Sequence, residues 1–284
     1  MAGIRPAAYP RRYRRGAGAC YPGLMLTIFD MPILPSLTAL AFAITFAGLL
    51  AGGLVKGVIG LGLPLVSVPI MTLAIDGRLG LALVSVPIVV TNVVQAVQGG
   101  MWRETFRRFW PLLLTMMVML PVGVSILAQL DPGTVAVAIG LVILLFCANQ
   151  ASPWQFTVPP AVEAPLGALA GAVGGFIGGV SGFAGPPIIM YLVALRLQRH
   201  FFVASLGVVY ICAAFALYVS MASTSLLGWQ EIVWSCSACV PVLVGIALGT
   251  WLRGLIREAT FRRIIVVVLA VIALKLLAQG AGLL

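Results

Sequence analysis

The sequence predicts an all-α polytopic membrane protein whose two homologous halves are arranged as inverted repeats. Three observations lead to this fold class. Of the 284 residues, 62% are hydrophobic and only 8% are charged, whereas soluble domains carry about 25% charged residues. The apolar residues fall into long runs, and the mean hydropathy is +1.14. A stretch rich in glycine and proline also occurs twice, at corresponding places in the chain.

Ten apolar runs follow one another along the chain, separated by short polar or Gly/Pro-containing stretches. We expect helices at about 34–55, 57–75, 79–98, 110–129, 134–149, 164–180, 182–195, 201–223, 232–252 and 264–282. A spanning helix needs about 20 apolar residues, and several runs reach that length while others are shorter. We therefore expect about seven to ten full crossings of the membrane.

The chain divides into four parts by composition. We expect a basic N-terminal tail at 1–32, a first transmembrane repeat at 33–150, a Pro-rich linker at 151–163 and a second transmembrane repeat at 164–284. Each repeat is expected to contain one helical hairpin broken by glycine and proline, followed by about three transmembrane helices.

The duplication is most visible in the two Gly-rich stretches. GLVKGVIGLGLPLVSVPI (53–70) aligns without a gap on GAVGGFIGGVSGFAGPPI (171–188), with seven identities in eighteen positions. Shared Gly and Pro bias accounts for part of this match. The order of apolar runs and loops downstream is also similar in the two halves, which favours an internal duplication.

The net charge of +10 does not point to a nucleic-acid partner, because the arginines lie in short clusters between apolar runs. Such clusters mark cytoplasmic loops of membrane proteins. We expect basic loops at 102–108 in the first half and at 196–200 and 253–263 in the second. These loops are not equivalent in the two halves, so equivalent loops would lie on opposite sides of the membrane, as in an inverted repeat.

Gly/Pro-broken helices at matching positions in two halves are the best sequence indication of a transporter binding site. Irregular backbone is tolerated at membrane depth only where protein or a water-filled cavity lines it. The breaks create helix N-termini whose free N–H groups attract anions, and glycine lets the backbone approach a ligand. The sequence therefore predicts an anion site near the midplane, although such glycines also serve close helix packing.

Thirteen residues in and near the two stretches are candidates for contacting a substrate: Lys56, Gly57, Gly60, Gly62, Pro64, Asn92, Gln95, Gly175, Gly178, Gly179, Ser181, Gly182 and Pro186. Lys56 would add a positive charge to the site, or it would extend to the membrane interface. Asn92 and Gln95 share a helix face that lines a pathway or bonds a neighbouring helix. Ser181 is a hydroxyl donor within the second stretch.

The same composition excludes other function classes. No apolar run contains a pair of carboxylates, a nucleophile with a base, or a nucleotide-binding loop, so we predict no enzyme activity, no cofactor and no metal. A secondary transporter of a small anion fits best, with substrate bound between the broken helices and alternating access. A passive anion channel and a membrane subunit that anchors partner proteins are the alternatives.

The two Gly-rich stretches, GLVKGVIGLGLPLVSVPI and GAVGGFIGGVSGFAGPPIIM, resemble the duplicated signature of the sulfite exporter TauE/SafE family, and the likeness extends from about residue 36 to the end. The resemblance implies a permease of the bacterial inner membrane that exports sulfite or an organosulfonate. Its partners would be this small anion and the lipid bilayer, with no nucleic acid. Coupling to a proton and assembly into an oligomer stay open.

Overall fold

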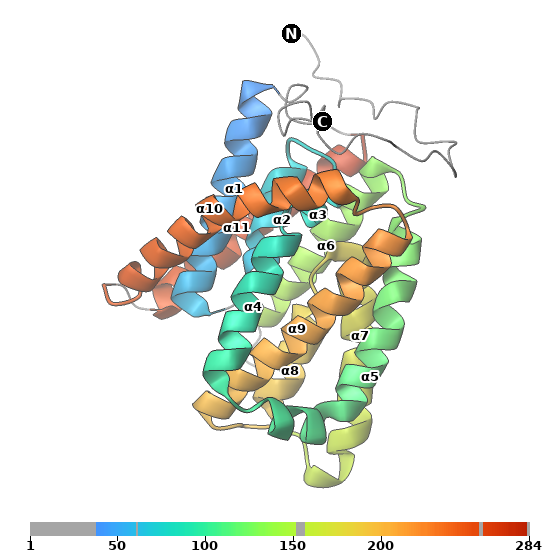
Figure 1. The fold of residues 1–284 in the computed structure, drawn as a ribbon, viewed down its shortest axis with the longest axis vertical. Coiled ribbons are helices and arrows are strands. Elements are labelled where there is room, and N and C mark those ends of the chain that lie inside the picture. The colour runs from blue at the N-terminus through green and yellow to red at the C-terminus, as the bar shows by residue number, and fades with distance from the viewer. Residues whose placement is uncertain (1–37, 61, 152–156, 256–257, 283–284) are drawn as a thin grey trace, which may run out of the picture.

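The computed structural model describes residues 38–60, 62–151, 157–255 and 258–282, and within these ranges it is helical with no strand (Figure 1). The helices are α1 (Ala39–Ile59), α2 (Leu63–Thr72), α3 (Gly77–Leu83), α4 (Ser85–Gly99), α5 (Trp102–Leu127), α6 (Pro132–Ala151), η2 (Pro160–Val162), α7 (Glu163–Ser181), α8 (Gly185–Ala194), α9 (Arg199–Ser223), α10 (Trp229–Leu252) and α11 (Glu258–Gly280). The prediction of an all-α protein is confirmed, and each of the ten expected runs contains a helix.

Six of the described helices are long and apolar enough to cross a membrane, namely α1, α5, α6, α7 with η2, α9 and α10. The bent pair of α3 and α4 makes up to seven. α2 and α8 have 10 residues each, so each is about 15 Å long, half the thickness of the hydrocarbon core. The chain is therefore a multi-pass membrane protein, and α2 and α8 are each too short to cross the hydrocarbon core alone.

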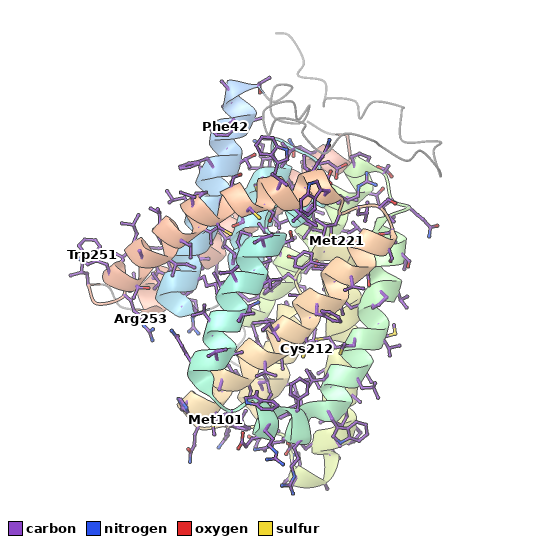
Figure 2. All side chains as sticks on the ribbon, viewed as in Figure 1. Phe42, Met101, Cys212, Met221, Trp251 and Arg253 are labelled. Atoms are coloured by element: carbon purple, nitrogen blue, oxygen red, sulfur yellow. The ribbon has the colours of Figure 1, made fainter. Side chains whose placement is uncertain are left out.

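Large apolar side chains cover the outside of the bundle. Phe42 on α1 and Trp251 on α10 point away from the protein (Figure 2), with half or more of each side chain exposed. Inside, Met116, Leu192 and Val242 are fully buried. An apolar exterior is the expected boundary with lipid.

All three basic segments expected to be loops include helical residues, and α9 begins at Arg199, inside the expected loop at 196–200. Residues 102–108 form the first two turns of α5, and α11 begins at Glu258, inside the expected loop at 253–263. Hydropathy misses these turns because an α-helix continues past the hydrocarbon layer, where arginines face water. Arg108 is one of these arginines. Its partly exposed guanidinium donates to both carboxylate oxygens of Glu163, at the start of α7, at 2.6 and 3.1 Å.

Four helices before residue 152 each pack against a helix after residue 156. α1 packs along α10, α4 along α9, α5 along α7, and α6 along α11 (Figure 1). The connection from α4 to α5 lies at the lower end of Figure 1, near Met101 in Figure 2, whereas the connection from α9 to α10 lies at the upper end. The two parts of the chain are interlocked rather than placed side by side.

Glycines make two of these pairings close. A Cβ at Gly53 would collide with the backbone oxygen of Val242, and a Cβ at Gly249 with that of Leu54, which brings α1 and α10 into backbone contact. In the pairing of α7 with α5, a Cβ at Gly175 would lie 2.5 Å from the backbone oxygen of Met116 on α5. Small residues at such crossings are a common means of packing helices in membranes.

The bend between α3 and α4 has a local cause and a specific support. Pro87 has no N–H and its ring clashes with the carbonyl four residues earlier, so the Leu83 oxygen loses its helical partner and the axis turns by 44°. The buried Ser235 hydroxyl of α10 donates to that oxygen at 2.8 Å and accepts from the Val86 N–H at 2.9 Å. Ser235 thus satisfies backbone groups that lipid cannot.

The two Gly-rich stretches form matching helix breaks. α1 ends at Gly60 with φ 88°, where the N–H of Gly60 bonds to the Lys56 oxygen at 2.7 Å. α7 ends at Gly182 with φ 75°, where the N–H of Gly182 bonds to the Gly178 oxygen at 2.7 Å. These ends match at an offset of 122 residues. The gapless alignment, at 118, is therefore wrong in register by four residues, about one helical turn.

The expected N-terminal tail at 1–32 lies outside the described residues. Of the expected linker at 151–163, residues 152–156 also lie outside them, and η2 occupies Pro160–Val162. α7 begins at Glu163, next to the expected start of the second repeat.

Candidate anion-binding site

A cavity lies where the two helix breaks approach each other, with an empty volume of about 550 Å³ including its opening. The breaks contribute one wall each, and α4 and α9 close the space between them. Its lining consists of Lys56, Gly62, Leu63, Pro64, Ile88, Asn92, Leu120, Gly178, Gly182, Phe183, Ala184, Tyr210, Ala213, Ala214, Leu217 and Tyr218. This is the place where the sequence predicts a site.

Lys56 supplies the positive charge of the cavity. It lies in the last turn of α1, where the negative end of the helix dipole favours a cation. Its ammonium donates to the side-chain oxygen of Asn92 on α4 at 2.5 Å, and Asn92 is 4% exposed. The lysine therefore turns inward rather than toward the membrane interface, and no carboxylate among the described residues forms an ion pair with it.

The first turn of α2 and Ala184, the residue directly before α8, also line the cavity. Gly62, in the left-handed region with φ 99°, precedes α2, and Pro64 lies in its first turn. The first N–H groups of a helix have no partner within it. α8 offers fewer such donors, because Pro186 and Pro187 follow Gly185 and carry no N–H. The two breaks are thus alike in backbone but unequal in donors.

Several predicted glycines serve helix packing instead of lining the cavity. Gly57 packs against Gly249 of α10, and Gly179 packs against Gly123 of α5. Gly175 contacts Met116, as described above, and Gly60 forms the end of α1 with open space beside it.

Gly178 both lines the cavity and packs tightly. A Cβ on this residue would lie 2.7 Å from the Cβ of Ala184 and 3.0 Å from its Cα. Gly182 also lines the cavity, and a side chain there would overlap Leu81. Both glycines are needed because the chain turns back on itself at the second break.

The remaining three candidates lie near the cavity without being part of its lining. The Gln95 amide donates to the Val203 oxygen at 3.3 Å, which joins α4 to α9. The Ser181 hydroxyl donates to the Ile177 oxygen at 2.8 Å and faces a smaller apolar cavity between α2, α6 and the second break. Pro186 is buried at the start of α8.

Two tyrosines of α9 that the sequence analysis did not single out line the cavity. The hydroxyls of Tyr210 and Tyr218 are buried and have no hydrogen-bond partner among the described residues. A buried hydroxyl normally has one, so each of these two lacks a partner that a ligand group would supply. The available signal was a pair of phenols eight residues apart within an apolar run, with the small residues Ala213 and Ala214 between them.

Comparison with known proteins gives the family. The family model described as sulfite exporter TauE/SafE matches residues 44–276 of the chain, which confirms the resemblance of the two Gly-rich stretches. No curated protein and no solved structure matches the chain. The family consists of membrane transporters of sulfite-type anions rather than enzymes. The chain belongs to the sulfite exporter TauE/SafE family.

Proposed function

We propose that this protein is a secondary transporter that exports a small anion, sulfite or an organosulfonate, across the inner membrane of a bacterium. The substrate binds in the cavity between the two helix breaks. The site residues that contact it are Lys56 and Asn92, together with the backbone at Gly62, Gly178 and Gly182.

The observation that carries this proposal is the Lys56–Asn92 pair at the cavity wall. A charge removed from water is costly unless it is paired, and within the described residues the ammonium has an amide oxygen as its acceptor. An ammonium has three donors, so two stay available to substrate oxygens. An anion in the cavity would supply the charge that balances the lysine.

The helix pairing supports alternating access by an inverted repeat. α1 packs on α10 as α7 packs on α5, and α4 meets α9 between them. These pairings are those expected if a pseudo-two-fold axis relates α1 to α7 and α5 to α10. Rocking of one repeat against the other around a fixed central site is the usual motion of such transporters.

The test is sulfite uptake into liposomes that contain the purified protein. We expect saturable uptake that is accelerated by sulfite on the other side, and a loss of about tenfold or more in Lys56→Met, since charge-assisted hydrogen bonds contribute about 1.5–3 kcal/mol each. Lys275→Met is the matched control, because Lys275 is an exposed lysine of another apolar helix, α11. It should transport like the wild type.

Three results would count against the proposal. Uptake that neither saturates nor responds to sulfite on the opposite side would indicate a channel. No uptake by a folded wild type would remove sulfite as substrate. Equal losses in Lys56→Met and Lys275→Met would mean that the two lysines act on folding rather than on the anion.

A further inference from the structure

The cavity is lined by a long segment of α9. Its wall on this helix extends from Tyr210 to Tyr218 and includes Ala213, Ala214 and Leu217. Eight residues of α-helix rise about 12 Å. A single oxyanion such as sulfite is much shorter than that, so it would occupy one end of the space and leave the other end unfilled.

Contacts between α4 and α9 show at which end of the cavity Asn92 lies, near Tyr210 or near Tyr218. A Cβ on Gly99 would lie 2.7 Å from the Cβ of Ala204, and a Cβ on Gly207 would lie 3.0 Å from the backbone nitrogen of Ala96. From the first contact to the second, the residue number decreases along α4 (99 to 96) and increases along α9 (204 to 207). The two helices are therefore antiparallel. Continuing this register places residue 92 level with residue 211, and residue 85 level with residue 218.

The cavity therefore has a charged end and an uncharged polar end. Lys56 and Asn92 lie at the level of Tyr210, whereas Tyr218 lies about two turns further along α9. Tyr218 is 8% exposed, and its buried hydroxyl has no partner among the described residues. Apolar side chains of Ile88 and Leu217 line the space as well.

The charge of the lining limits the ligand further. Lys56 is the one cation among the described residues that line the cavity. A second negative charge at the far end would be buried without a partner, which is costly. A hydroxyl or another uncharged hydrogen-bonding group would satisfy the Tyr218 hydroxyl instead.

We propose that the cavity selects an elongated organic monoanion with an oxyanion head at Lys56 and Asn92, an aliphatic middle, and an uncharged polar group at Tyr218. This inference rests on the proposed function and adds a specificity-determining residue, Tyr218. Sulfite would bind at the charged end alone.

The experiment measures how well two sulfonates compete with labelled sulfite for uptake into proteoliposomes. Butane-1-sulfonate and 4-hydroxybutane-1-sulfonate share head and chain and differ in the terminal hydroxyl. In the wild type we expect the hydroxylated anion to compete about three- to tenfold better, the effect of one hydrogen bond. In Tyr218→Phe the order should reverse, because the hydroxyl is then buried without a partner.

Tyr210→Phe is the matched control, since it removes the same atom from the same helix at the charged end. The ratio between the two sulfonates should persist in it. Size-exclusion profiles and melting temperatures establish that each variant is folded. A wild type that takes up sulfite but does not distinguish the two sulfonates would overturn the inference and leave the proposed function standing.

Two other results would also be decisive. A preference that persists in Tyr218→Phe, or that disappears in Tyr210→Phe instead, would overturn the assigned orientation of the ligand. A folded wild type that takes up no sulfite, and whose melting temperature neither sulfonate raises, would overturn the proposed function and this inference together.

Discussion

At the scale of single residues, the two parts of the chain contribute different polar groups to the cavity, although the two helix breaks are alike in backbone. The offset of 122 residues places Gly178 at the position of Lys56 and Ala214 at the position of Asn92. It likewise places Tyr210 at the position of Ile88. The first half thus contributes the charge and the amide, and the second half contributes two phenols, Tyr210 and Tyr218. A ligand that fits this cavity has two chemically different ends.

Replacing Asn92 by aspartate should separate stability from anion binding. The side chain keeps its shape but gains a charge that pairs with Lys56. We expect the anion-free protein in detergent to melt about 2–4 °C higher, the effect of about 1 kcal/mol in a protein of this size class. The stabilisation by added sulfite should be lost, because the carboxylate takes the place of the anion.

Asn92→Leu provides the comparison, since it removes the acceptor without adding a charge. It should lower the melting temperature. An Asn92→Asp protein that sulfite still stabilises as strongly as the wild type would show that the anion does not bind at Lys56.

At the scale of helices, a side chain from the second half holds the bend of the first half. The Ser235 hydroxyl also accepts from the Ser85 hydroxyl at 3.1 Å. These bonds fix the direction of α4, and α4 carries Asn92 into the cavity. The bend therefore affects the site although it lies outside the lining.

Ser235→Ala should destabilise the protein by about 1–3 kcal/mol, because it leaves the Leu83 oxygen and the Val86 N–H buried without their partner. Melting in detergent measures the change. Ser237→Ala on the same helix is the control, since its exposed hydroxyl bonds to the nearby Trp234 oxygen. Equal melting temperatures for the two variants would contradict the supporting role of Ser235.

Much of the helical content could be predicted from hydropathy, because each helix is largely apolar. The bend at Val84 could also be predicted, because Pro87 interrupts the helical hydrogen bonds there. The hydrogen bond between Lys56 and Asn92 could not be predicted, because 36 residues separate the two and pairing between helices leaves no periodic signal in the sequence. Gly57 and Gly179 could not be told from ligand-facing glycines, since both roles require a small residue.

At the scale of the whole molecule, the two parts of the chain depend on each other. α1 finds its glycine-mediated partner in α10, and α7 finds its partner in α5. The cavity is also shared, because Lys56 and Asn92 come from one part and Tyr210 and Tyr218 from the other. Neither part contains a complete site.

Fragments 1–151 and 157–284 should therefore be unstable when expressed singly and should restore sulfite uptake when co-expressed. Each fragment alone would expose its glycine faces to lipid. Size-exclusion chromatography and uptake measurements check the two statements. A single fragment that is monodisperse and resists proteolysis would show that the parts fold independently.

The pairing of α1 with α10 also sets an order of events during synthesis. Gly57 enters the membrane about 190 residues before Gly249, its neighbour in the finished protein. At ribosomal rates of about 5–20 residues per second, roughly 10–40 s separate the two. α7, by contrast, emerges after α5 is already in place. Of the four main helix pairs, the first helix thus waits longest for its partner, and its narrow glycine surface spends this interval against lipid or the insertion machinery.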